Sequence, residues 1–77
     1  MITPSQCRAA RALLGWSQQQ LADASRAGNA TIRNFESGRS SPVNATLDVH
    51  QRALEAAGVI FVDENGEGPG VRSRKAK

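Results

Sequence analysis

The 77-residue chain has few of the residues on which disulfide, metal and redox chemistry depends, with one cysteine, one histidine and no tyrosine. The lone Cys7 cannot form an internal disulfide, and one cysteine with one histidine cannot build a common structural zinc site. We therefore expect Cys7 to be a small buried side chain, the compartment to be a reducing cytoplasm, and the protein to have no metal site.

Membrane and export signals are also lacking. No apolar run approaches the ~20 residues that a membrane-spanning helix needs. Residues 1–6 have neither the charged nor the apolar region of a signal peptide. We expect no membrane partner and no secretion.

The patterns of catalytic sites are missing as well. The sequence has no Walker loop, no HExxH and no Cys pair, and its serines show no arrangement with histidine and aspartate. His50 is expected to fill space in the core or on the surface. We predict no enzymatic activity, no catalytic residue and no cofactor.

Length and charge set further limits. A chain of 77 residues forms one domain, near the lower limit for a self-sufficient core, and a second subunit would add stability. The net charge of +3 is unevenly spread, because residues 63–70 carry −3 and residues 71–77 carry +4. The basic tail is suited either to contact phosphates or to keep the protein in solution, and both interpretations stay open.

Three helices are predicted in the first half of the chain, over 3–14, 17–25 and 28–37. Thr3 is a favourable N-cap and Pro4 a favourable first helical residue. Ser17, with Gln20 three residues later, forms the sequence signature of a capping box. Gly15 ends the first of these helices.

A fourth helix is predicted over 45–57, with Asn44 as its cap. Its inward stripe is expected to contain Leu47, Val49 or His50, Leu54 and Ala57. Residues 59–62 are β-branched and aromatic and therefore predict a strand. This strand pairs either with residues 71–74 in a hairpin or with the same strand of a second subunit.

Two short helices joined by a tight turn, the second beginning with small polar residues, have the form of a helix-turn-helix. The residues Gln18-x-x-Leu21-Ala22, Ala30-Thr31-Ile32, Phe35-Glu36-x-Gly38 and Pro42 carry a closer likeness. In these positions residues 7–57 resemble the XRE/Cro family of DNA-binding regulators. The resemblance implies an all-α, lambda-repressor-like bundle of four to five helices, followed here by the short C-terminal strand or hairpin. It also implies a dimer acting on a palindromic operator.

The turn departs from the family pattern, which has glycine, an aliphatic residue and then serine or threonine. Arg26, Ala27 and Gly28 occupy these positions. Either Arg26 adopts a positive φ, or the turn shifts so that Gly28 is its flexible residue.

The helix over 28–37 is the expected DNA-reading element. Ile32 and Phe35 are three residues apart and face inward, so the remaining side chains project outward. The expected base contacts are Asn29, Ala30, Thr31, Arg33 and Asn34. Asparagine pairs with adenine, arginine with guanine, and a methyl group with thymine. The alternative is an ordinary solvated helix face.

The resemblance implies contacts with the DNA backbone and a structural ion pair. The expected phosphate contacts are Gln18, Gly28, Arg39, Ser40, Ser41 and Arg11. An ion pair between Arg11 and Glu36 is implied mainly as a brace for the recognition helix. Contacts with DNA phosphates orient a protein on the duplex, but they do not select a base sequence.

We expect a DNA-binding domain at residues 1–58 and a hairpin with a basic tail at 59–77. The second segment is a possible dimerisation element through Val59, Ile60, Phe61 and Val62. The leading hypothesis is a dimeric, cytoplasmic repressor that binds double-stranded operator DNA. The alternative is an antitoxin-like or adaptor protein whose C-terminal segment binds another protein.

Overall fold

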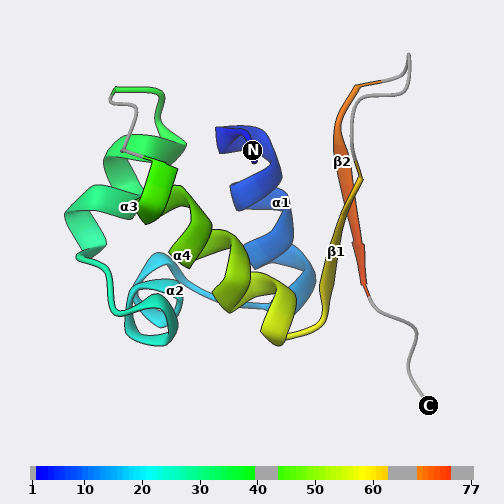
Figure 1. Cartoon of the computed structure of the whole chain (residues 1–77), viewed down its shortest axis with the longest axis horizontal. Coiled ribbons are helices and arrows are strands. Elements are labelled where there is room, and N and C mark those ends of the chain that lie inside the picture. Colours follow the sequence, from blue (N-terminus) through cyan, green and yellow to red (C-terminus); the bar gives the residue numbers. More distant parts are fainter. Residues whose placement is uncertain (1, 40–43, 63–67, 74–77) are drawn as a thin grey trace.

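The computed structural model describes residues 2–39, 44–62 and 68–73. Its elements are α1 (Pro4–Leu14), α2 (Gln18–Ser25), α3 (Asn29–Glu36), α4 (Asn44–Ala56), β1 (Val59–Val62) and β2 (Gly70–Ser73). The four helices pack together, and the two strands form a hairpin beside α1 (Figure 1). The predicted helical fold with a C-terminal hairpin is confirmed.

The predicted capping box at Ser17 is present, and the predicted N-cap Thr3 forms a second box that was not predicted. Thr3 Oγ1 accepts a hydrogen bond from the backbone N–H of Gln6 (3.1 Å), and Gln6 Oε1 accepts one from the backbone N–H of Thr3 (2.9 Å). Ser17 and Gln20 make the same pair of contacts at the start of α2, at 3.1 and 2.8 Å. Each box satisfies two backbone donors at the helix N-terminus that have no partner within the helix.

The core contains residues from all four helices and from β1. Its buried apolar side chains are Ile2, Cys7, Ala10, Leu21, Ala22, Ile32, Phe35, Leu47, Leu54 and Val59. Cys7 is therefore the buried side chain that its place in the sequence predicts. Phe61 and Val71 pack against this core from the two strands.

Helix α4 decides between Val49 and His50 in the predicted stripe, and it shows that Ala57 and the predicted first residue were wrong. Leu47, His50 and Leu54 are buried, because their spacing of three and four residues places them on one face. Val49 is 43% exposed, since two residues from Leu47 is more than half a helical turn away. Ala57 is exposed and lies beyond the helix, which ends at Ala56. The helix also begins at Asn44 itself, one residue before the predicted start.

The hairpin is antiparallel, with Val59 opposite Ser73 and Val62 opposite Gly70. Of the two pairings left open by the sequence, the structure contains the one within the chain, one residue earlier than the predicted 71–74. The buried Gln6 ties the hairpin to α1, because its side-chain N–H groups donate to the carbonyls of Val62 (3.2 Å) and Gly70 (3.0 Å). The hairpin lies at the opposite end of the molecule from α3 (Figure 1).

Candidate nucleic-acid interface

The turn between α2 and α3 resolves the alternatives left by the sequence. Arg26 takes the left-handed conformation with φ 59°, and its N–H donates to the carbonyl of Ala22. Gly28 has an extended conformation and is the N-cap of α3, although it has no side chain to bond the first turn. The turn therefore keeps its ordinary register, with arginine at the position where glycine is easiest to accommodate.

Helix α3 is two-sided. Ile32 and Phe35 are buried on its inner side. The candidate base contacts all keep access to solvent. Ala30 and Arg33 are exposed, and Asn29, Thr31 and Asn34 are half-buried. The outer side therefore offers two amides, a guanidinium group and small methyl-bearing side chains, which together can donate to and accept from base edges.

Polar side chains connect this outer side to α2. Asn29 Nδ2 donates to Gln19 Oε1 (3.3 Å), and Arg33 Nη1 donates to Asn29 Oδ1 (3.3 Å). Gln19 Nε2 in turn donates to Asp23 Oδ1 (2.9 Å). Gln19 and Asp23 were not predicted as site residues, although their spacing of four residues is the spacing of side-chain pairs on a helix.

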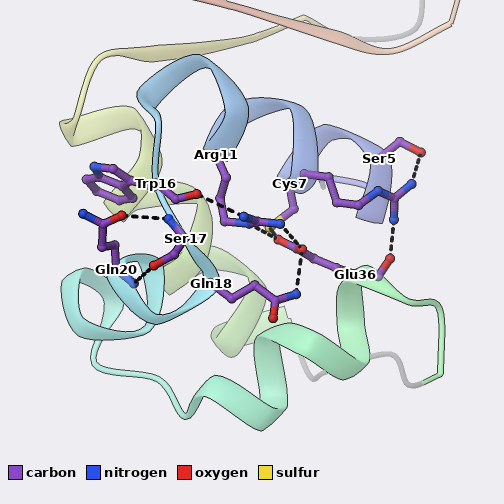
Figure 2. Close-up of polar contacts among 9 residues, drawn as sticks. Ser5, Cys7, Arg11, Trp16, Ser17, Gln18, Gln20 and Glu36 are labelled. Atoms are coloured by element: carbon purple, nitrogen blue, oxygen red, sulfur yellow. Dashed lines mark hydrogen bonds and ion pairs between the residues drawn. The ribbon is translucent and has the colours of Figure 1, made fainter.

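Behind α3, three side chains from α1 and α2 donate to the carboxylate of Glu36 (Figure 2). We call Cys7, Arg11, Gln18 and Glu36 the Glu36 cluster. Arg11 donates from Nε to Oε2 and from Nη2 to Oε1 of Glu36, both at 2.7 Å. Cys7 Sγ donates to Oε2 (3.1 Å), and Gln18 Nε2 donates to Oε1 (3.1 Å). Because Glu36 is the last residue of α3, the cluster joins α3 to both α1 and α2.

The electrostatics of the cluster favour charged Glu36 and Arg11. Burial by itself would raise the pKa of Glu36, but the hydrogen bonds from Arg11, Cys7 and Gln18 lower it below its ordinary value. The hydrogen bond to Glu36 raises the pKa of Arg11. Burial, followed by the bond to the Glu36 carboxylate, raises the pKa of the Cys7 thiol well above its usual range. Cys7 is thus a neutral donor and not a reactive thiolate.

Arg8 was not assigned a site role from the sequence, yet it also reaches α3. Its Nη1 donates to the backbone carbonyl of Glu36, and its Nη2 donates to Ser5 Oγ (3.2 Å). Cations near a helix C-terminus stabilise the carbonyls that lack intrahelical partners. Arg8 and Arg11 therefore hold the same end of α3 through its backbone and its side chain.

The comparison with protein families identifies the same type of unit from the sequence. The family model described as Helix-turn-helix matches residues 8–49, from α1 into α4. The chain belongs to the XRE/Cro-type helix-turn-helix family. No curated protein matches it. The family domain is a DNA-binding regulatory one, so the chain is a DNA-binding regulator of this type.

Within the helix-turn-helix domain, the predicted phosphate contacts have different surroundings. Gln18 and Arg11 belong to the Glu36 cluster and are half-buried. Gly28 and Arg39 are exposed, just before and just after α3. Ser40 and Ser41 lie outside the described residues.

The described part of this helix-turn-helix protein contains neither a candidate metal site nor a candidate membrane span. Among residues 2–39, 44–62 and 68–73, no group of three or more His, Cys, Asp or Glu side chains is placed to hold a metal ion. None of the helices in the same ranges has the length and apolar character needed to cross a bilayer.

Proposed function

We propose that the protein is a sequence-specific transcriptional repressor that inserts α3 into the major groove of double-stranded operator DNA. The observation that carries this proposal is the outer side of α3, where Asn29, Arg33 and Asn34 keep solvent access on a helix anchored by the Glu36 cluster. A recognition helix held rigidly at its far end presents its donors and acceptors without a further ordering cost.

We propose that one set of residues selects the base sequence and that another set positions the protein on the DNA backbone. Asn29, Ala30, Thr31, Arg33 and Asn34 contact base edges. Gln18, Gly28, Arg39, Ser40, Ser41 and Arg11 contact phosphates or support those contacts. Gln18 has two amide N–H groups, so it can bond Glu36 with one and a phosphate with the other. Arg11 is 19% exposed, which supports its main role as a brace.

We further propose a homodimer on a palindromic operator, with the segment over 59–77 as the dimerisation element. A two-stranded hairpin has an unpaired edge on each strand, which favours pairing with a second copy. Val59 is buried in its own subunit and Phe61 packs against the core. Ile60 is 36% exposed and lies opposite Arg72 in the hairpin. We therefore place the proposed dimer contact at Ile60.

The hairpin surface also supports a second function, an antitoxin-like or adaptor role in which it binds another protein. The same exposed Ile60 favours this possibility. Sedimentation of purified wild type and Ile60→Lys separates the two. A dimer lost in the variant supports the homodimer, whereas a wild type that is monomeric at high concentration favours the adaptor role.

Selection of bound sites from a random duplex library tests the DNA function. In competition assays at several salt concentrations, Arg33→Ala is expected to relax preference at one base pair by about 1–3 kcal/mol. Arg39→Ala is expected to weaken binding to all sequences alike and to reduce the salt slope by about one phosphate contact. Arg52→Ala, an exposed arginine on α4, is the control of matched charge. Equal losses for Arg33→Ala and Arg52→Ala on specific and random duplexes would count against the proposal.

A further inference from the structure

Four polar side chains form a continuous row of hydrogen bonds from α2 onto the outer side of α3. In order they are Asp23, Gln19, Asn29 and Arg33, and we call this row the amide relay. Its three bonds measure 2.9 Å from Gln19 to Asp23, 3.3 Å from Asn29 to Gln19 and 3.3 Å from Arg33 to Asn29. The relay reaches α3 at its first residue and one turn further along.

The two ends of the relay fix the orientation of the two amides between them. An ionised carboxylate only accepts hydrogen bonds, and a guanidinium group only donates them. Gln19 must therefore turn its NH₂ group towards Asp23 and its oxygen towards Asn29. Asn29 must likewise turn its NH₂ towards Gln19 and its oxygen towards Arg33. Any amide flipped within this row would place two donors or two acceptors face to face.

We infer that Asp23 and Gln19 are positioning residues that set the base preference of Asn29, and this inference rests on the proposed function. With both its neighbours bonded, Asn29 retains one N–H and one oxygen lone pair. One donor beside one acceptor is the combination that binds N7 and the N6 amino group of adenine. The relay thus commits Asn29 to adenine and prevents the amide rotation that would let it tolerate other bases.

The character of Asp23 and Gln19 supports a role in recognition over a role in folding. Both side chains are exposed and lie outside the buried core. A carboxylate on a DNA-facing helix also repels phosphates and so weakens non-specific binding. Asp23 therefore lowers general affinity while it orients the amides that select sequence.

The test measures discrimination at the base pair where Asn29→Ala loses the wild-type preference. Competition between duplexes that differ only there is expected to show a loss of roughly two- to tenfold for Gln19→Ala, the size of one hydrogen bond. Asp23→Glu keeps an acceptor in place and is expected to retain discrimination within about twofold. Gln51→Ala is the matched control, because Gln51 Nε2 donates to Glu55 Oε2 (3.1 Å) with the same spacing on α4.

Asp23→Lys separates orientation from simple charge. The added positive charge should strengthen binding to random duplex. A lysine at position 23 is a donor, however, so it would face the NH₂ group that Gln19 turns towards Asp23 when Arg33 donates at the other end of the relay. The inference therefore expects Asp23→Lys to bind random duplex more tightly and to discriminate worse than Asp23→Ala. Unchanged discrimination in Gln19→Ala and Asp23→Lys, with Asn29→Ala still losing its preference, would overturn the relay and leave the proposed function standing. Unaltered sequence preference in both Asn29→Ala and Arg33→Ala would overturn the proposed function itself.

Discussion

Replacing Glu36 with glutamine is expected to lower the free energy of unfolding by about 3 kcal/mol. Glu36 is 3% exposed and accepts from Cys7, Arg11 and Gln18, so an amide N–H there faces groups that also donate. Loss of one partner of a buried ion pair costs about 3–5 kcal/mol. Arg11 is 19% exposed and keeps some contact with water, so we expect the loss of stability to lie at the lower end of this range.

Urea and thermal denaturation of the whole chain, followed by circular dichroism, measure this loss. For a domain of this size, a loss of about 3 kcal/mol corresponds to a fall in Tm of roughly 12–24 °C. Asp48→Asn removes an exposed carboxylate from α4 and is expected to stay within about 0.5 kcal/mol of wild type. A loss below about 1 kcal/mol for Glu36→Gln would refute the argument. A near-zero coupling energy in the double-mutant cycle of Arg11→Ala and Glu36→Ala would do the same.

The dependence of stability on pH provides a second test of the contacts of the Glu36 carboxylate. Because the pKa of Glu36 is lower in the folded protein, its carboxylate contributes stability above the ordinary value of 4.5. That contribution is lost as the pH falls through the lower folded value. The stability difference between wild type and Glu36→Gln is therefore expected to shrink below pH 4.5.

Three further changes test other parts of the fold. Gln6→Ala should lower stability by about 1–3 kcal/mol and speed hydrogen exchange in the hairpin, because the carbonyls of β1 and β2 lose buried donors. Burial lowers the pKa of His50, against the opposing charge of Glu36, so stability should fall as the pH drops below about 6.5. His50→Leu should abolish that slope in urea titrations between about pH 6.5 and 5. Arg26→Gly, which relieves the positive φ, should raise Tm and stabilise by about 0.5–1 kcal/mol; a lower Tm would contradict the strain at this turn.

Local chemistry explains what the sequence could predict. The predicted N-cap at Thr3, capping box at Ser17 and glycine after α1 each depend on neighbours within a few residues. The Arg11–Glu36 contact came from resemblance, because no local rule joins positions 25 residues apart. The base and phosphate roles stay predictions, supported by the exposure of α3.

The features that could not be predicted from local sequence patterns depend on how the helices and the hairpin pack together. Gln6 bonds carbonyls 56 and 64 residues away, and no spacing in the sequence indicates such a contact. The choice between Val49 and His50 depended on the rotation of α4 against the core, which buries an imidazole whose ring nitrogens have no hydrogen-bond partner among the described residues. The thiol of Cys7 became a donor because Glu36 lies beside it.

The separation of α3 from the hairpin has a consequence for operator length. The two lie at opposite ends of a subunit whose longest dimension is 32 Å (Figure 1). Two subunits joined hairpin to hairpin would hold their recognition helices on the order of 60 Å apart, closer to two turns of B-DNA than to one. Such an assembly would favour inverted repeats whose centres lie about 20–21 base pairs apart, leaving the DNA between them uncontacted by α3.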